Sequence, residues 1–141
     1  MDNMLKTKKL QLENEVSQLE KLASFLDDLG DEWGLSPGLV MSLNLVLEEA
    51  FTNVVFYAWS DSSPHLIDIE FEETGGLLKM ILSDEGREYD PTKKEEPDFE
   101  RPVEDRTIGG LGIFLIKKIM DSVVYQREGN RNYLIMTKRT N

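Results

Sequence analysis

Two side chains with hard oxygen atoms lie four positions apart in the stretch LNLVLEEAFTNVVFYA, at Glu49 and Asn53. A helix turns by about 100° per residue, so both would share one face at the edge of an apolar stripe. There a partly desolvated Glu49 could act as a base, and the amide oxygen of Asn53 could bind Mg²⁺. The alternative is an ordinary solvated face that includes Glu48. Leu45 and Phe56 fall on this same side, which favours a face that something covers.

A third candidate follows the apolar run in LSDEGREYDP. Asp84 ends the run, and Gly86 permits a tight turn two residues later. A carboxylate at the end of a strand can accept a hydrogen bond from a ligand amine. The alternative is an Asp-x-Gly turn with no ligand.

Glycines crowd the start of a second apolar run, in IGGLGIFLIKKIMD. Gly110 and Gly112 would let backbone N–H groups approach an anion, and the dipole of the following helix favours negative charge there. Arg106 lies just upstream and could pair with phosphate oxygens. The alternative is a flexible hinge before an ordinary amphipathic helix.

These patches need elements to hold them, and hydrophobic periodicity predicts the order β-α-α-β-β-loop-α-β-β. Ser17 and Glu20 have the spacing of a capping box, and Gly30 is the expected stop of the first helix. Ser36 should cap the second helix, which runs to about Tyr57. The other expected elements are a short strand in 8–16, strands at 65–73 and 77–84 with a turn at 74–76, a helix to about Asp121, and a final hairpin that turns at Gly129 and Asn130.

The expected fold class is α+β, a two-layer α/β sandwich with helices on one face of a mostly antiparallel mixed sheet. The second helix should turn a single stripe toward the core, made of Leu39, Leu43, Val46, Ala50 and Val54. The segment 85–108 is charged, rich in proline and without periodicity. It begins at the Asp-x-Gly turn and ends at the glycines, so we interpret it as a lid.

Composition limits the classes of function. The chain has 141 residues, and 27 acidic against 16 basic residues give a net charge of −11. This charge disfavours nucleic acid and anionic membranes as partners. There is no cysteine, and we expect neither a signal peptide nor a membrane span. The prediction is one cytoplasmic domain, residues 1–141.

Taken in order, the three motifs resemble the Bergerat-type ATP-binding (GHKL) fold of histidine kinases, Hsp90, type II topoisomerases and MutL. The stretches EEAFTNVVFYA, DEGREYDP and GGLGIFLIKKIMD are most similar to the anti-sigma-factor serine kinase branch, the RsbW and SpoIIAB type. Tyr89 stands where that branch usually has Phe. Glu88 replaces a glycine common in the wider superfamily, and Tyr57 occupies a position where many relatives have His or Lys.

The resemblance implies a role for each matching position. Glu49 would be the catalytic base, Asn53 the magnesium ligand, and Asp84 the acceptor for the adenine amino group. Gly86 would shape the wall beside adenine. The implied phosphate-binding and lid positions are Gly110, Leu111 and Gly112, with Arg106 and Thr107.

The implied function is that of an ATP- and Mg²⁺-dependent protein serine/threonine kinase. Its substrate would be a small anti-anti-sigma protein of the STAS class, and it would hold a sigma factor in the same partner-switching circuit. A homodimer is left open. The single histidine, His65, is expected to have a core or surface role and not to relay phosphate. Two alternatives remain: an ATP-gated binding module without efficient transfer, and a small ATP-hydrolysing switch.

Overall fold

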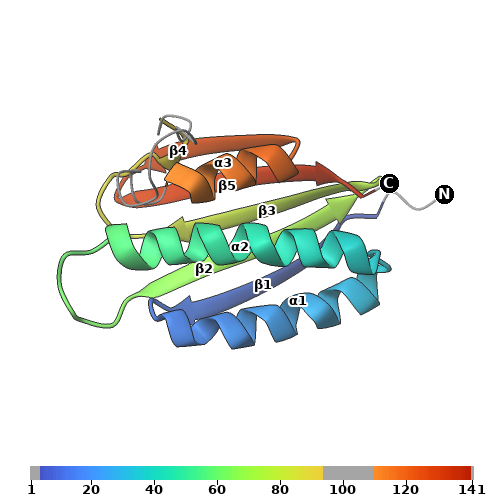
Figure 1. The fold of residues 1–141 in the computed structure, drawn as a ribbon, viewed down its shortest axis with the longest axis horizontal. Helices are drawn as coiled ribbons and strands as arrows, with labels where there is room; N and C mark the ends of the chain where they lie inside the picture. Colours follow the sequence, from blue (N-terminus) through green and yellow to red (C-terminus); the bar gives the residue numbers. More distant parts are fainter. Residues whose placement is uncertain (1–3, 94–109, 141) are drawn as a thin grey trace.

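A computed structural model describes residues 4–93 and 110–140. Over these residues the chain forms two layers, a five-stranded sheet with helices on one face (Figure 1). The strands are β1 (Lys6–Glu13), β2 (Leu66–Thr74), β3 (Leu77–Asp84), β4 (Ser122–Glu128) and β5 (Arg131–Arg139). The helices are α1 (Leu19–Trp33), α2 (Pro37–Tyr57) and α3 (Gly110–Ile119), with 3-10 turns at Val16–Gln18 and Pro91–Lys93.

The sheet has the order β1-β2-β3-β5-β4, and each pair of neighbours is antiparallel. The predicted class and element order are therefore confirmed, although no parallel pair appears among the described strands. The predicted hairpin turns also occur, with positive φ at Gly75, Gly76 and Gly129. β3 lies in the middle of the sheet, so the end of this strand is surrounded on both sides.

The predicted limits of the first helix are wrong at both ends. Ser17 lies in a 3-10 turn and makes no capping bond to the helix, which begins at Leu19. The helix continues past Gly30 and ends at Gly34, which has φ 68°. Gly30 is buried because α2 comes close: a Cβ on it would lie 2.5 Å from Cγ2 of Val40. Tertiary contact, not chain termination, explains this glycine.

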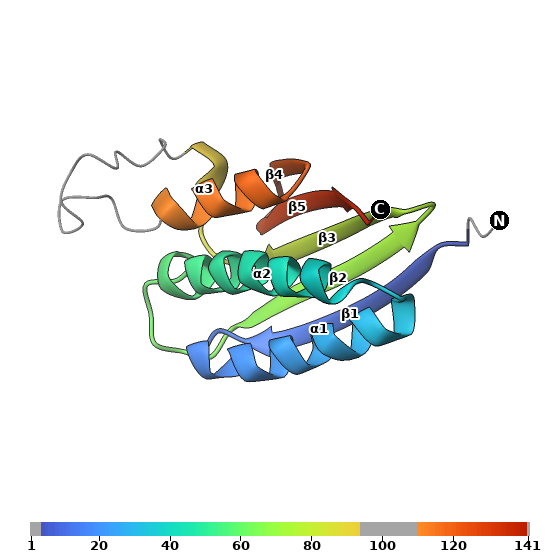
Figure 2. The same cartoon turned by 45° about the vertical axis from the view of Figure 1, so that its right-hand side comes forward.

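The second helix begins and ends as predicted. The Ser36 hydroxyl accepts a hydrogen bond from the N–H of Leu39 at 3.2 Å, and proline takes the first helical position. Figure 2 shows α2 between α1 and α3 over the sheet. Because it is flanked on both sides, it buries more than one stripe: Leu47 and Phe51 are buried although they were not predicted, whereas Leu39 and Val54 are half-buried.

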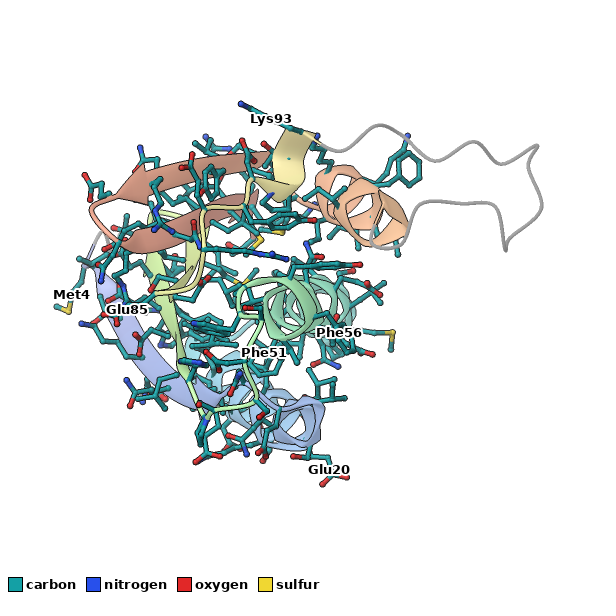
Figure 3. The ribbon with its side chains drawn as sticks, turned by 90° about the vertical axis from the view of Figure 1, so that its left-hand side faces the viewer. Met4, Glu20, Phe51, Phe56, Glu85 and Lys93 are labelled. Atoms are coloured by element: carbon teal, nitrogen blue, oxygen red, sulfur yellow. The ribbon has the colours of Figure 1, made fainter. Side chains whose placement is uncertain are left out.

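By length and composition, α2 would also suit a membrane crossing, contrary to the expectation that no segment would. In the described structure its apolar residues have another use. Phe51 points into the interior and is fully buried, whereas Phe56 lies on the outward side and is 64% exposed (Figure 3). Five residues of the helix, Leu43, Val46, Leu47, Ala50 and Phe51, are buried in the core, so packing accounts for part of its apolar character.

Candidate functional site

Asp84 anchors the site at the end of the central strand. Only 3% of this residue is exposed. Its Oδ1 atom accepts two hydrogen bonds, from the N–H of Gly86 at 2.8 Å and from Nδ2 of Asn132 at 3.0 Å. None of the described residues donates a hydrogen bond to its other oxygen, Oδ2. The carboxylate can therefore accept one more donor, such as a ligand amine.

The charge state of Asp84 reflects opposing effects. Burial raises the pKa of its carboxyl group above the ordinary value for aspartate. The hydrogen bonds from Asn132 and Gly86, and the guanidinium groups of Arg131 and Arg127, act in the opposite direction and limit the rise. The carboxylate is thus held by donors that favour its ionised form.

Gly86 allows the turn after Asp84 to lie close against the end of α2. A Cβ at this position would lie 2.5 Å from the Cβ of Ala58 and 2.6 Å from its carbonyl oxygen, so any larger residue would push the turn off the end of α2. The next residue ties the two segments together. Arg87 donates its backbone N–H to Ala58 O at 2.8 Å and its Nε to Tyr57 O at 2.6 Å.

A small pocket opens beside this turn, with a volume of about 30 Å³. That volume holds about two water molecules. Its walls come from α2, from the ends of β3, β4 and β5, and from the segment after the turn. The lining residues are Ala50, Asn53, Val54, Ala58, Leu82, Asp84, Tyr89, Pro91, Tyr125, Asn132 and Leu134.

The face of α2 that adjoins this pocket carries the other two predicted residues. Asn53 lines the pocket, and Glu49 lies one turn earlier on the helix. Glu49 contacts the first turn of α3: a Cβ built on Gly112 would lie 2.7 Å from its Oε2 atom. The absence of a side chain at Gly112 therefore leaves space for the Glu49 carboxylate, a contact that the sequence analysis did not predict. Partial burial raises the pKa of Glu49, and the neighbouring carboxylate of Glu48 raises it further.

The structure thus brings together Glu49 and Asn53 of α2, Asp84 and Gly86 at the end of β3, and Gly112 of α3, from three separate parts of the chain. Gly110 and Leu111 lie in the first turn of α3, but the surroundings of these two residues lie outside what the structure describes. Arg106 and Thr107 fall outside the described residues, as does the part of the predicted lid from 94 to 108.

The described start of the predicted lid is more regular than expected. Residues Pro91–Lys93 form a 3-10 turn, and Pro91 is buried against the pocket. Lys117 of α3 donates its Nζ to Thr92 O at 2.7 Å. The sequence analysis missed this turn although its signal is local: Asp90 precedes Pro91, and its Oδ1 atom accepts a hydrogen bond from the N–H of Thr92 at 2.9 Å.

Sequence reasoning also missed Asn132, which contacts Asp84 from the neighbouring strand. A signal existed in the alternation of β5. Leu134 and Met136 point into the core, and Asn132 occupies the same side of the strand with 6% of its surface exposed. A polar residue on a buried side needs partners, and this one finds them around the site.

Comparison with known proteins agrees with this geometry. The model of the histidine kinase-like ATPase domain matches residues 12–138. Among solved structures, the RsbU and RsbW domains of Rv1364c from Mycobacterium tuberculosis superpose with a TM-score of 0.65 at 13% identity, covering 95% of this chain and 32% of that one. The histidine kinase AdeS of Acinetobacter baumannii gives 0.52 at 16% identity, over 98% and 69% of the two chains. The chain belongs to the histidine kinase-like ATPase family.

Curated relatives define the branch. The serine/threonine-protein kinase BtrW of Bordetella bronchiseptica is 31% identical over 112 residues, which is 79% of this chain and 78% of the relative. The serine-protein kinase RsbW of Listeria monocytogenes is 33% identical over 121 residues, 82% and 76% of the two chains. Within the family, the chain therefore belongs with the serine/threonine-protein kinases of the RsbW and BtrW type, and the predicted resemblance is confirmed.

Proposed function

We propose that the chain binds ATP with Mg²⁺ and transfers the terminal phosphoryl group to a serine or threonine hydroxyl of a partner protein. The observation that carries the proposal is the buried Asp84 carboxylate, which has a free acceptor oxygen in a pocket next to the Glu49 and Asn53 face of α2. An exocyclic amine of a purine would satisfy that oxygen.

The donor set fits such a nucleotide. An apolar wall from Ala50, Val54 and Leu82 suits a flat base, and Asp84 supplies one polar anchor. The enclosed volume of about 30 Å³ is smaller than an adenine ring, so we expect the pocket to widen when a base binds. ATP supplies the phosphoryl group, and Mg²⁺ neutralises charge on the phosphates.

Asn53 would hold the metal ion together with the phosphates. No group of three His, Cys, Asp or Glu side chains that could hold a metal occurs in the parts of the chain that the structure describes. A single amide oxygen beside the nucleotide fits Mg²⁺, which is commonly bound by few protein ligands plus substrate phosphates. The first turn of α3 would receive the phosphates at its N-terminus.

Glu49 would take the proton from the acceptor hydroxyl or orient it for attack. The nearness of its carboxylate to Gly112 in the first turn of α3 supports this role, because the phosphates would bind at that turn. A base at this place needs to be ionised, and its raised pKa makes it a better proton acceptor once it is. The remaining catalysis would come from positioning and charge stabilisation.

For the acceptor we propose a small STAS-domain anti-anti-sigma protein, with a sigma factor as the competing partner. The support comes from the relatives, which are named serine-protein kinase RsbW. The acidic chain, with a net charge of −11, argues against nucleic acid as a direct partner. A cytoplasmic location would match the use of ATP.

A second candidate is an ATP-gated binding module. Its specific support is the outward side of α2, where Met41 is 75% and Phe56 64% exposed. Tyr57 also stacks on Tyr89, with ring centroids 5.5 Å apart, where a charged residue would have served transfer more directly.

The experiment is single-turnover transfer of labelled phosphate from ATP to a co-encoded STAS protein. Phosphoserine or phosphothreonine on the acceptor supports the kinase. Tight binding of ATP without transfer refutes the kinase and favours the module, whereas release of free phosphate without an acceptor favours a hydrolytic switch.

A further inference from the structure

Asn132 lines the pocket and is the hub of a buried hydrogen-bond network. It pairs with Asp84 across the strands β3 and β5. Its Nδ2 atom donates to Asp84 Oδ1 at 3.0 Å and to the carbonyl oxygen of Arg87 at 2.8 Å. Its Oδ1 atom accepts from the hydroxyl of Tyr125 at 2.5 Å and from NH1 of Arg127 at 3.0 Å.

These partners allow only one orientation of the amide. On one side of Asn132 lie a carboxylate and a carbonyl oxygen, which can only accept. On the other side lies a guanidinium group, which can only donate, together with a hydroxyl. A rotated amide would place its oxygen against the Asp84 carboxylate and its NH₂ group against the Arg127 guanidinium. The network is therefore self-consistent in a single arrangement.

This arrangement determines which oxygen of Asp84 is available. Gly86 and Asn132 both donate to one oxygen, Oδ1, so turning the carboxylate partly away from these donors would break two hydrogen bonds inside a buried site, whereas a half-turn only exchanges its two equivalent oxygens. Oδ2 is left as the acceptor that Asp84 can offer to the pocket. Arg127 strengthens the same turn by donating NH1 to the carbonyl oxygen of Gly86 at 2.7 Å.

We propose that Asn132 is a positioning residue for purine selection: by fixing Asp84, it makes the pocket accept a 6-amino purine and reject a 6-oxo purine. The inference rests on the proposed function, because it requires a nucleotide base in this pocket. Asn132 acts through Asp84, whose carboxylate would meet the base directly.

The chemistry behind the selection is the protonation state of Asp84. An ionised carboxylate accepts from the amino group of adenine and repels the carbonyl oxygen of hypoxanthine or guanine. A protonated carboxyl group can donate to that carbonyl instead, which removes the discrimination. Burial raises the pKa of Asp84, and the donation from Asn132 is the largest effect that opposes the rise.

Two charged groups near Asp84 also lower its pKa, as the hydrogen bond from Asn132 does. Arg127 on β4 and Arg131 on β5 both lower its pKa. Arg131 is itself shared with Asp68 on β2, at 2.5 Å, which weakens its effect on Asp84. Loss of the Asn132 donor should therefore raise the pKa further, and selection for adenine should fail at a higher pH than in the parent protein.

The test compares binding of ATP and ITP by calorimetry over a series from acidic to neutral pH. ITP differs from ATP by the 6-oxo group in place of the amino group. The parent should prefer ATP at neutral pH and lose this preference on acidification. Asn132→Leu, which is close in size and has no donor for Asp84, should reduce the ATP to ITP preference roughly 10–100-fold at neutral pH. Asn132→Asp keeps the shape but sets a carboxylate against Asp84, so its loss should be larger.

Asn14→Ala is the matched control. The amide oxygen of Asn14 accepts from the N–H of His65 at 2.9 Å, so the variant loses a structural hydrogen bond without altering the lining of the pocket. It should lose stability but keep the ATP to ITP preference and its dependence on pH. A merely structural role for Asn132 would make the two kinds of variant behave alike, which would overturn the proposal.

Three further outcomes are decisive. If the parent binds ATP and the Asn132 variants keep its preference at every pH, the role of Asn132 is refuted while the proposed function stands. A preference in the parent that does not change with pH also refutes it, even if neither variant folds. If the parent binds neither nucleotide, the proposed function is refuted, and this inference with it.

Discussion

Glu49 is the residue whose surroundings most closely define the proposed chemistry. It lies partly buried on α2, against Gly112 of α3, with Glu48 as its sequence neighbour. Burial and the like charge both raise its pKa, so the carboxylate combines contact with the predicted phosphate position and increased basicity. A surface glutamate would have neither property.

Glu49→Gln should separate binding from chemistry. The change preserves size but removes the base, so transfer to the acceptor should fall roughly 10²–10⁴-fold. ATP affinity should hold or rise, because one negative charge near the triphosphate is lost. Single-turnover transfer and calorimetry measure the two quantities. Glu48→Gln is the control, because Glu48 precedes Glu49 and its side chain points about 100° away around the helix. Equal losses of transfer in both variants would contradict the assignment of Glu49 as the base.

The pH dependence of transfer should report the same carboxylate. A base with a raised pKa is protonated, and inactive, at a pH where an ordinary glutamate is still ionised. Activity should therefore fall on acidification earlier than an unperturbed glutamate would predict. In Glu48→Gln the acid limb should move to lower pH, because one of the two causes of the raised pKa is removed. A limb that does not move in single-turnover profiles would show that another group titrates.

Asn53→Ala should weaken binding of ATP only when Mg²⁺ is present. Asn53 lines the pocket, and in the proposed site its amide oxygen would be one of the six ligands that Mg²⁺ demands. Calorimetry with and without Mg²⁺ should show that the parent binds ATP more weakly when the metal is absent. In the variant, removal of Mg²⁺ should change the ATP affinity only slightly. Equal affinity of the parent in both conditions would count against a metal site here.

At the scale of the element, the junction of α2 and α3 is the part that sets the site. Glycine weakens a helix interior, yet Gly112 lies inside the first turns of α3. The reason is space, because the carboxylate of Glu49 occupies the place that a side chain would need. Gly112 therefore weakens α3 but allows it to contact α2 closely.

Gly112→Ala should therefore uncouple stability from activity. The added methyl group would lie 2.7 Å from Oε2 of Glu49 and displace that flexible side chain, so transfer should fall. Helix propensity alone would stabilise the fold by roughly 0.5–1 kcal/mol. Thermal unfolding and transfer rates measure the two effects. Gly38→Ala is the control, since nothing lies within 4 Å of its new Cβ; it should leave transfer unchanged, and unchanged transfer in Gly112→Ala would contradict the contact.

At the scale of the whole molecule, the site is assembled from parts that are distant in the chain. Asn53 comes from α2, Asp84 from β3, and Asn132 from β5, and they meet only in the folded protein. A ligand of this pocket therefore binds the native state and not the unfolded chain. Binding and folding are linked by mass action.

ATP with Mg²⁺ should raise the free energy of unfolding by roughly 2.7 kcal/mol at a ligand concentration of about 100 Kd. Hydrogen exchange should slow in the segment 85–93 as well, because Tyr89 and Pro91 form a wall of the pocket. Thermal unfolding and exchange with and without nucleotide measure both effects. GTP at equal concentration should do less, and unchanged exchange in this segment would argue against its part in binding.

The sequence by itself determined the order of elements, the antiparallel sheet, both hairpin turns and the start of α2, because alternation, glycine turns and the Ser36-Pro37 cap are local signals. It also indicated Glu49, Asn53, Asp84 and Gly86 through helical spacing and a resemblance to known motifs. These features depend on residues near each other in the chain, so a pattern can reveal them.

Only the tertiary structure decided the rest. Gly30 is a contact between helices and not a stop, because Val40 approaches it from the next helix. Gly112 leaves space for the carboxylate of Glu49, which lies 63 positions earlier in the sequence. Asn132 orients Asp84 only because β5 pairs with β3 in the register that sets the two side by side. Contacts between distant segments depend on three-dimensional packing, and no local period in the sequence records them.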